Sequence, residues 1–418
     1  MTERPLLTPG VCDLGGILVE SPSIEEQIRL LSSGALEVIG LEDLAAKLRQ
    51  SAQAKRPLVV KLGADPSAPD LHIGHAVVLR KLRQFQDLGH QVVFLIGDFT
   101  GRVGDPTLRS DSRRQLSADE VAENAATYRQ QVHRILDPEK TRLEFNSTWL
   151  GALTFSEVLE LAARQTVARM LEREDFKLRF KDNRPIYLHE FFYPLMQGYD
   201  SVALGADVEL GGSDQRFNLL TARELMRDMG LEPEVVVLMP LLVGTDGQQK
   251  MSKSLGNQIA LEDAPEMMFG KAMSIPDQTV PEYLQLATDL TPDQAADLLE
   301  QHRSGQLSAR DLKEAMAHAL VRLCHGEAAA KAAEAEFRRV FRDKGAPTDL
   351  PEVTLPGPVD LSALLVTLKA AKSLSEARRL IGQGAVSLDG ERLNGTEQLS
   401  PKTAGTLRVG KHRFWKLG

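Results

Sequence analysis

The sequence is poor in cysteine: it has two in 418 residues, Cys12 and Cys324, and they lie far apart. A disulfide framework and a cysteine-based zinc site are therefore excluded. No apolar run approaches the ~20 residues needed to span a bilayer. The opening stretch, MTERPLLTPGVCDLGG, lacks the basic start and apolar core of a signal peptide. We therefore expect a cytoplasmic protein without a membrane segment.

Repeats and low-complexity tracts are also missing, and 418 residues are too many for one core of ordinary size, so two or three domains are expected. Charge is divided unevenly along the chain. The net charge is −8, yet residues 361–418 hold ten Lys or Arg and four Asp or Glu, a balance of +6 that leaves −14 for residues 1–360. A basic tail suggests a polyanionic partner, with an ordinary solvated surface as the alternative.

The first part of the chain predicts a strand–helix–strand unit. Residues 56–65 form a short apolar run that ends near a glycine, as a buried strand does, and residues 90–101 have the same character. The helix between them ends at Gly89 and keeps apolar residues at helical spacing: Val78, Leu79, Leu82, Phe85 and Leu88. Residues 234–244 are typical of another interior strand. This pattern favours an α/β, Rossmann-like parallel sheet.

The other segments are mostly helical, over 166–180 and continuously after Leu261. Residues 291–302 begin with Thr291 at an N-cap position. Four prolines between 344 and 358 indicate a stiff linker. The predicted domains are residues 1–261 with an N-terminal extension and inserted helices, an all-helical domain at 262–343, the linker at 344–358, and a small α+β domain at 359–418.

The stretch DPSAPDLHIGHAVV, residues 65–78, places two histidines where the first strand meets its helix. Ligands of open parallel sheets bind at the carboxyl ends of strands, and a helix start offers free N–H groups to phosphate. His72 and His75 share a helical face and can donate to the same phosphates, while Gly74 lets a flat ring approach the backbone. Polar surface residues or helix caps are the alternative interpretation.

A second candidate loop, DGQQKMSKSLGN at residues 246–257, follows the predicted strand 234–244. Its Lys250 and Lys253 stand among small polar residues, and a lysine pair on a flexible loop suits the capture of a leaving polyphosphate. A solvated loop is the alternative. The first loop contains the sequence HIGH (residues 72–75) and the second contains KMSKS (residues 250–254). The two sequences together on one α/β sheet indicate a phosphate site more specifically than either does alone.

HIGH and KMSKS match both signatures of class I aminoacyl-tRNA synthetases without a substitution, and nearly the whole chain resembles the bacterial tyrosyl-tRNA synthetases. The resemblance implies that L-tyrosine reacts with ATP to give tyrosyl-adenylate and pyrophosphate, and that the tyrosyl group passes to the 3′-terminal adenosine of tRNA(Tyr). It also implies a homodimer, and Mg²⁺ accompanying ATP, although no dedicated metal cage is visible. The residues expected to stabilise charge on the phosphates are His72, His75, Lys250 and Lys253, with Gly74 and Lys253 also contacting ATP.

The amino-acid pocket is predicted from YPLMQGYD, where Tyr193, Gln197 and Asp200 share one helical face. A solvated helix surface is the alternative. By the resemblance, Tyr193 and Gln197 hold the substrate ammonium together with Asp105, and Asp200 accepts the phenolic hydroxyl. A pocket that binds a substrate hydroxyl rejects the analogue without it, and tyrosyl-tRNA synthetases are the established case, discriminating against phenylalanine by about 10⁵. No editing domain is therefore expected.

Further positions match the family in order and spacing, although each alone is typical of a turn or a surface. In VELGGSDQRFN, Gly212 would allow close approach of the nucleotide and Asp214 would accept ribose hydroxyls. The other matches are Gln215 near the reacting carboxylate, Asp65 beside the ammonium and the nucleotide, Asn146 in the tyrosine pocket, and Arg109 and Arg113 on a loop able to reach the diphosphate.

Two positions depart from the family pattern. Many members carry a tyrosine two residues before Gly63, where it also bonds the phenolic hydroxyl, whereas this chain has Lys61. Lys61 therefore either contacts the phenol or points at a carboxylate. Leu108 in GDPTLRS stands where the family usually has glycine, which leaves the shape of the arginine loop open.

The tail predicts a short helix ending near Gly382, then a strand, a DG turn and another strand. With the basic and aromatic VGKHRFWKLG that follows, it resembles an S-four-type RNA-binding domain. The expected phosphate contacts are Lys372, Arg378, Arg379 and Lys411. By family analogy, the helical domain would lie near the anticodon arm.

Two other functions compete with this prediction. Tryptophanyl-tRNA synthetases share the fold, but the basic tail and the trio Tyr193, Gln197 and Asp200 argue against them. A non-catalytic relative that only binds RNA would not need intact HIGH and KMSKS motifs.

Overall fold

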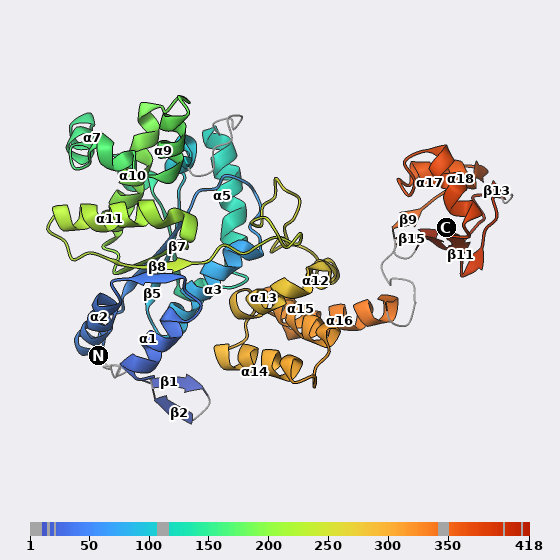
Figure 1. The fold of residues 1–418 in the computed structure, drawn as a ribbon, viewed down its shortest axis with the longest axis horizontal. Helices are drawn as coiled ribbons and strands as arrows, with labels where there is room; N and C mark the ends of the chain where they lie inside the picture. The colour runs from blue at the N-terminus through green and yellow to red at the C-terminus, as the bar shows by residue number, and fades with distance from the viewer. Residues whose placement is uncertain are drawn as a thin grey trace, which may run out of the picture. The chain divides into compact units, whose positions relative to one another are not determined.

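The computed structural model describes residues 11–14, 17–20, 22–106, 117–341, 351–395, 398–410 and 413–418. The chain divides into two compact units, residues 1–330 and 331–418 (Figure 1). Within the described parts of the chain, no helix is long and apolar enough to cross a membrane.

A six-stranded sheet forms the centre of the first unit, with strand order β3-β8-β7-β4-β5-β6. The predicted strands are present as β4 (Val59–Ala64), β5 (Gln91–Ile96) and β8 (Val235–Met239). Sequence reasoning did not identify β6 (Thr141–Phe145), β7 (Val208–Gly212) or the edge strand β3 (Glu37–Ile39). All neighbours in this sheet are parallel except β3 and β8. The prediction of a Rossmann-like parallel sheet is therefore confirmed.

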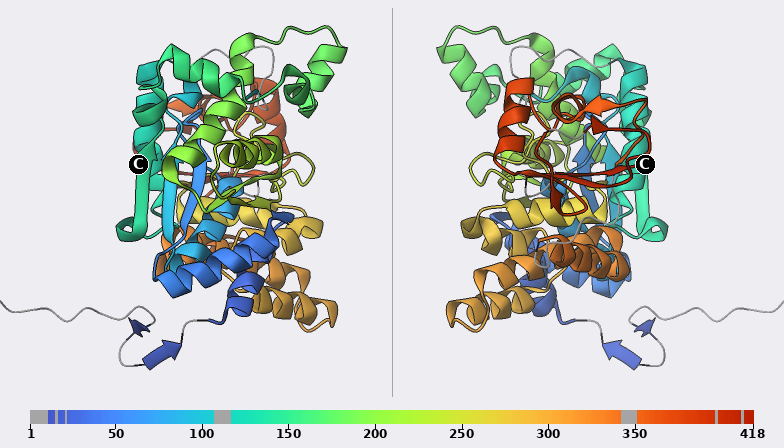
Figure 2. Two further views of the ribbon diagram at one scale, coloured as in Figure 1. Left: turned by 90° about the vertical axis from the view of Figure 1, so that its left-hand side faces the viewer. Right: turned by 90° about the vertical axis from the view of Figure 1, so that its right-hand side faces the viewer.

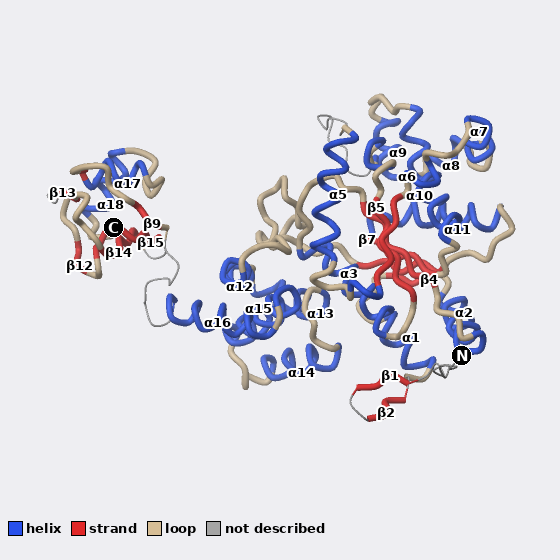
Figure 3. Tube along the Cα trace, turned by 180° about the vertical axis from the view of Figure 1, so that it is seen from behind, coloured by secondary structure: helices blue, strands red, loops and turns tan. Residues whose placement is uncertain are grey.

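Helices cover both faces of this sheet (Figures 1 and 3). One side carries α1 (Ile24–Ser32), α2 (Leu41–Ala54) and α3 (Ile73–Asp87), and the other carries α10 (Leu188–Leu204) and α11 (Arg216–Asp228). The interior strands are thus shielded on both faces, and the apolar residues of β5 and β8 are almost fully buried. Burial on both faces explains why these strands form unbroken apolar runs in the sequence.

Further elements of the first unit lie before α1 and between β5 and β8. They are the hairpin β1 (Val11–Leu14) and β2 (Ile17–Glu20), the helices α4 (Thr100–Val103), α5 (Ala118–Val132), α6 (Ser147–Leu150), α7 (Phe155–Ala162), α8 (Val167–Met170) and α9 (Glu174–Lys181), and the 3₁₀ turns Pro138–Lys140 and Ser213–Gln215. Residues 166–180, predicted to be helical, form two helices, because Arg173 takes an extended conformation that separates α8 from α9.

Residues after Leu261 are helical, as predicted. The helices are α12 (Pro265–Ser274), α13 (Val280–Leu286) with the 3₁₀ turn Asp277–Thr279 before it, α14 (Pro292–Arg303), α15 (Ala309–His325) and α16 (Glu327–Phe341). Helices α12 to α15 pack on one another (Figure 2). Thr291 is the N-cap of α14, as expected, since its Oγ1 accepts the Gln294 N–H at 3.2 Å.

The second unit contains a small α+β module with its own core. Its helices α17 (Leu361–Thr367) and α18 (Leu374–Gly382) pack on each other, and its sheet has the order β12-β11-β14-β15-β9. The strands are β9 (Glu352–Val353), β11 (Val386–Leu388), β12 (Glu391–Arg392), β14 (Gly405–Val409) and β15 (Arg413–Leu417), and β10 (Val359–Asp360) pairs separately with β13 (Gln398–Leu399).

Part of the expected linker belongs to this module. Strand β9 pairs in parallel with the end of β15, and Leu355 is 4% exposed within the module's core. The linker expectation therefore does not hold for residues 351–358, whose alternating prolines resemble a spacer in sequence. Residues 342–350 lie outside the described residues.

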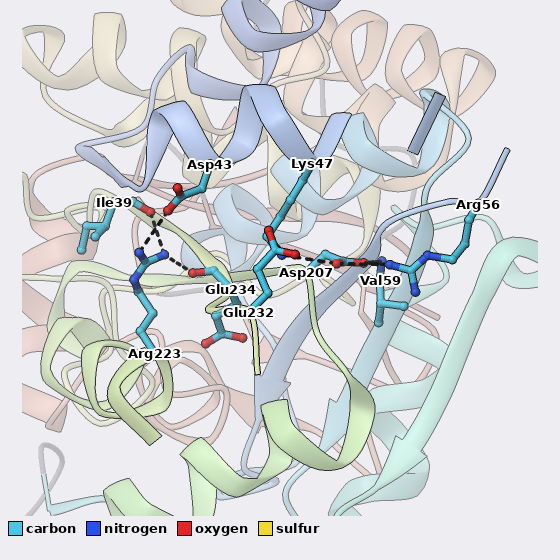
Figure 4. Close-up of polar contacts among 9 residues, drawn as sticks. All are labelled: Ile39, Asp43, Lys47, Arg56, Val59, Asp207, Arg223, Glu232 and Glu234. Carbon is cyan, nitrogen blue, oxygen red and sulfur yellow. Dashed lines mark hydrogen bonds and ion pairs between the residues drawn. The ribbon is translucent and has the colours of Figure 1, made fainter. Parts of the chain in front are cut away.

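A polar network fixes α2 to the amino ends of the strands (Figure 4). The Asp207 carboxylate, just before β7, accepts the Val59 N–H at 2.9 Å and lies 3.4 Å from Lys47 Nζ. Arg223 of α11 reaches the same helix through Asp43, at 3.2 Å. The Lys47 side chain is only 3% exposed, so its charge depends on its carboxylate partners.

We expect Asp207→Ala to lower the free energy of unfolding by about 3 kcal/mol, because it removes the buried partner of the Lys47 ammonium and leaves the Val59 N–H unpaired. Glu232→Ala is the matched control. Glu232 also contacts Lys47, at 3.5 Å, but is 59% exposed, so its removal should cost less than about 1 kcal/mol. Urea denaturation measures both changes, and equal losses would contradict the role given to Asp207.

Candidate active site

A cleft of about 950 Å³ opens at the carboxyl ends of the parallel strands. Residues that follow each of these strands line it, namely Asp65, Gly97, Asn146, Asp214 and Leu241. Open parallel sheets place ligands at this edge. The predicted site residues that line the cleft are Asp65, His72, Gly74, His75, Asp105, Asn146, Tyr193, Gln197, Asp200, Gly212, Asp214, Gln215, Lys250 and Lys253.

His72 and His75 stand at the start of α3. His72 is the N-cap residue, and its backbone N–H donates to His75 Nδ1 at 3.2 Å. A neutral His75 therefore carries its proton on Nε2. Desolvation by the surrounding protein lowers the pKa of His72 to about 2 and also lowers the pKa of His75. Both rings are consequently neutral hydrogen-bond donors near pH 7.

Gly74 is needed by His72 itself. A Cβ at position 74 would lie 2.9 Å from both Cε1 and Nδ1 of the His72 ring, which is closer than side chains pack. The expected approach of a flat ring to this glycine is thus made by an imidazole of the same chain. Approach of a ligand ring to Gly74 stays a prediction.

The loop before α3 is held by α5, which sequence reasoning did not connect to the site. The buried Gln131 accepts the Leu71 N–H at 2.6 Å and donates to the Pro69 carbonyl at 2.7 Å. Asn124 of the same helix donates to the Pro66 carbonyl at 2.9 Å. These contacts join residues about 60 positions apart, so no local sequence pattern predicts them.

Backbone pairing joins the HIGH motif to the chain that follows KMSKS. The Ile73 N–H donates to the Ile259 carbonyl and the Leu261 N–H donates to the Leu71 carbonyl, both at 2.9 Å. All four side chains are at most 1% exposed. The pairing therefore holds the two signature motifs beside one cleft.

Each lysine of KMSKS lies near a carboxylate of the cleft. Lys250 Nζ is 3.9 Å from Asp214 Oδ2, and Lys253 Nζ contacts Asp70 Oδ2. The lysine side chains are 48% and 49% exposed, so each ion pair is weak enough to be exchanged for a phosphate. Asp70 was not identified from the sequence.

Tyr193, Gln197 and Asp200 all face the cleft from α10, as their spacing predicted. The Tyr193 hydroxyl donates to Asp65 Oδ2 at 2.8 Å, and Thr100 Oγ1 donates to Asp65 Oδ1 at 2.7 Å. Burial raises the pKa of Asp65 to about 7, although both hydrogen bonds oppose the rise. One face of α10 is therefore coupled directly to the end of β4.

Asp200 is 3% exposed, and its two oxygens accept hydrogen bonds from different side chains. Trp149 Nε1 donates to Oδ1 at 2.7 Å and Asn146 Nδ2 donates to Oδ2 at 3.2 Å. Burial raises the pKa of Asp200 to about 7, with Lys61 the largest opposing influence. Each carboxylate oxygen keeps a second lone pair, so Asp200 can accept a further donor from the cleft. Trp149 was not predicted.

Asp105 is engaged by two side chains of the chain itself. Arg173 Nη2 donates to Oδ1 at 2.7 Å, and Gln215 Nε2 donates to Oδ2 at 2.8 Å. The side chains of Arg173 and Asp105 are each 5% exposed, so this is a buried ion pair. The Arg173 guanidinium neutralises part of the negative charge of Asp105, which is expected to attract the substrate ammonium. It was missed because it lies 68 residues away, in a stretch typical of a continuous helix.

Lys61 corrects the sequence-based prediction, because the structure does not place it in the lining of the cleft. Its side chain is fully buried, and Nζ lies 3.0 Å from Glu209 Oε1. Of the two alternatives left open, the carboxylate is therefore the partner. Direct contact of Lys61 with a phenol is not supported.

Several predicted residues cannot be placed in the site. Those outside the described residues are Leu108, Arg109, Arg113 and Lys411. Lys372, Arg378 and Arg379 belong to the second unit, where they are exposed beside or on α18. Sequence reasoning also missed Glu209, which lines the cleft from β7.

Comparison with known proteins agrees with this geometry. Residues 53–342 match the family model "tRNA synthetases class I (W and Y)", and residues 343–406 match "Tyrosine--tRNA ligase SYY-like C-terminal domain". A tyrosine–tRNA ligase of Moorella thermoacetica is 53% identical over 96% of this chain and 98% of its own length. One of Desulfotalea psychrophila is 52% identical over 96% of this chain and 99% of its own length.

Solved structures show the same fold. The tyrosyl-tRNA synthetase of Archaeoglobus fulgidus complexed with L-tyrosine aligns with a TM-score of 0.60 and 27% identity, covering 75% of this chain and 100% of that chain. A C-terminally truncated mitochondrial enzyme of Aspergillus nidulans aligns with a TM-score of 0.62 and 23% identity, covering 76% and 99%. With its HIGH and KMSKS loops beside one cleft, the chain belongs to the class I tRNA synthetases of the W and Y family and, within them, to the tyrosine–tRNA ligases.

Proposed function

We propose that this chain forms tyrosyl-adenylate from L-tyrosine and ATP in the cleft of its first unit, and then transfers the tyrosyl group to the 3′-terminal adenosine of tRNA(Tyr). One observation carries the proposal: the two phosphate-binding signatures and a buried polar slot around Asp200 line the same cleft. As a translation enzyme it would act in the cytoplasm.

The slot on α10 is suited to a zwitterion that carries a hydroxyl. Asp200 would accept the phenolic O–H, because its carboxylate is buried and keeps free lone pairs. Tyr193, Gln197, Asp65 and Asp105 would hold the ammonium, with Gln215 near the reacting carboxylate. Asn146 would act through Asp200, to which it already donates a hydrogen bond.

The adenylation step needs no general base, because the substrate carboxylate is already anionic. Its oxygen attacks the α-phosphorus of ATP, and pyrophosphate leaves. Rate enhancement would come from positioning and from donors that stabilise charge on the phosphates. His72 and His75 offer neutral N–H donors, and Lys250 and Lys253 would exchange their carboxylate partners for phosphate oxygens.

The nucleotide would lie over the HIGH turn and the end of β7. Asp214 would accept ribose hydroxyls, with Gly212 beside it, where a Cβ would meet Asp214 Oδ1 at 2.7 Å. By resemblance, Arg109 and Arg113 would contact the diphosphate. By the resemblance, Mg²⁺ would accompany the ATP substrate.

The second unit would bind tRNA through its basic residues. Lys372 lies just before α18 and Arg378 lies on it, and both are exposed. Arg379 on the same helix is 3.8 Å from Glu376 and keeps 62% of its side-chain surface exposed. Such cations would contact phosphates and so contribute affinity rather than sequence selection.

We also propose a homodimer. Large apolar side chains of α7 and the start of α10 are exposed, including Phe155 at 76% and Leu188 at 78%. Val167 and Phe180, on the helices between them, are 62% and 65% exposed. Several large, exposed apolar side chains on successive helices favour a protein interface over a purely solvated surface.

ATP–pyrophosphate exchange with each of the twenty amino acids tests the proposed activity. We expect exchange that depends on tyrosine, with phenylalanine and tryptophan far less effective, because a buried Asp200 left without the phenol would be unpaired. Tryptophan-dependent exchange, or none with any amino acid, would overturn the proposal.

Lys253→Ala should slow adenylate formation by one or more orders of magnitude, the usual cost of losing one donor to developing charge. Single-turnover kinetics with tyrosine and ATP measures this step. Lys140→Ala is the control, since Lys140 is 63% exposed and does not line the cleft. A Lys253→Ala rate equal to that of the control would remove the loop from the mechanism.

A further inference from the structure

A buried ion pair lies directly beneath the turn of α10 that carries Asp200. Lys61 of β4 and Glu209 of β7 occupy paired positions of adjacent strands, with Lys61 Nζ 3.0 Å from Glu209 Oε1. The two side chains are 0% and 1% exposed. Strand β4 stands between β5 and β7 in the sheet, a position where the direction of strand order changes and where ligands bind.

Lys61 also donates hydrogen bonds to α10 on both sides of Asp200. Its Nζ donates to Ser201 Oγ at 2.7 Å and to the Gln197 carbonyl at 3.3 Å. Glu209 accepts hydrogen bonds from the same two residues, from Ser201 Oγ at 3.0 Å and from Gln197 Nε2 at 3.4 Å. The helical turn from 197 to 201 is therefore anchored to the sheet by this one pair.

From this geometry we propose that Lys61 and Glu209 are positioning residues that set the place and charge of Asp200, and thereby the preference for tyrosine over phenylalanine. The inference rests on the proposed function, since it takes Asp200 as the acceptor of the phenolic hydroxyl. Lys61 and Glu209 act through Asp200, and Lys61 touches no substrate.

The charged groups that act on Asp200 come from several elements. Lys61 lowers the pKa of Asp200 and Glu209 raises it, with Lys61 the stronger of the two. Asp65 at the end of β4 is a further anionic neighbour, since Asp200 raises the pKa of Asp65. Trp149 and Asn146 face Asp200 as neutral donors and favour its ionised form.

Glu234, just before β8, belongs to the same buried cluster. Burial and the neighbouring Glu209 raise the pKa of Glu234 well above its usual value. The raised pKa favours the neutral form of Glu234. Glu234→Gln is therefore the matched control, because glutamine keeps the shape of that neutral form in the same cluster.

The readout is the ratio of kcat/KM for tyrosine to kcat/KM for phenylalanine, measured across pH by pyrophosphate exchange. Groups that serve the ammonium or ATP, including Asp65, act on both substrates and cancel in the ratio. Ionised Asp200 binds the phenol more strongly and is left unpaired by phenylalanine. The ratio should therefore rise with pH as Asp200 loses its proton, with a midpoint near the Asp200 pKa of about 7.

Lys61→Met should move this midpoint upward by about one pH unit or more and lower the ratio about tenfold at pH 7. Glu209→Gln should move it downward, measured in a Glu234→Gln background so that Glu234 cannot take over the lost charge. Glu234→Gln alone should leave the midpoint in place. A role in folding alone would reduce both rates without moving the midpoint.

Midpoints that coincide in all variants, or that move the same way for Lys61→Met and for the Glu209 variant, would overturn the inference. If Lys61→Met fails to fold, the Glu209 variant decides alone, since a midpoint that stays or rises contradicts the proposal. Absence of tyrosine-dependent exchange in the unmodified enzyme would instead contradict the proposed function.

Discussion

Two backbone hydrogen bonds, from Ile73 to Ile259 and from Leu261 to Leu71, hold together the half of the cleft that we propose binds phosphate. Their side chains are buried, so water cannot easily replace these bonds. They fix the base of the KMSKS loop against the start of α3, while the lysines at its tip remain half exposed. A reaction without a general base depends on such placement, because its donors must meet the phosphates as charge develops.

The half of the cleft proposed to bind the amino acid is held together by side-chain rather than backbone hydrogen bonds. Its carboxylates are buried or half-buried, and each is held by side chains of the chain itself: Asp65 by Tyr193 and Thr100, Asp200 by Trp149 and Asn146, and Asp105 by Arg173 and Gln215. Buried, satisfied polar groups are rigid and penalise any ligand that leaves one unpaired. Under the proposed function, the cleft would combine rigid selection of the amino acid with phosphate capture by half-exposed lysines.

Local patterns in the sequence predicted the parts of this site that depend on local geometry. Apolar runs indicated β4, β5 and β8, and the i, i+4, i+7 spacing correctly brought Tyr193, Gln197 and Asp200 to one side of α10. Contacts between distant segments were not predictable in this way. Arg173 reaches Asp105 only because the chain breaks between α8 and α9, and Lys61 faces Glu209 only because β4 pairs with β7, a strand that its glycine-rich sequence concealed.

The central claim is that one cleft holds the phenol of the substrate in the slot around Asp200 and its phosphate beside the HIGH and KMSKS motifs. A crystal structure of the enzyme with a non-hydrolysable analogue of tyrosyl-adenylate tests it most directly. The account predicts the phenolic oxygen within hydrogen-bond distance of Asp200 and the phosphate group between the HIGH histidines and the KMSKS lysines. A ligand bound with its phenol away from Asp200, or with its phosphate outside these motifs, would contradict it.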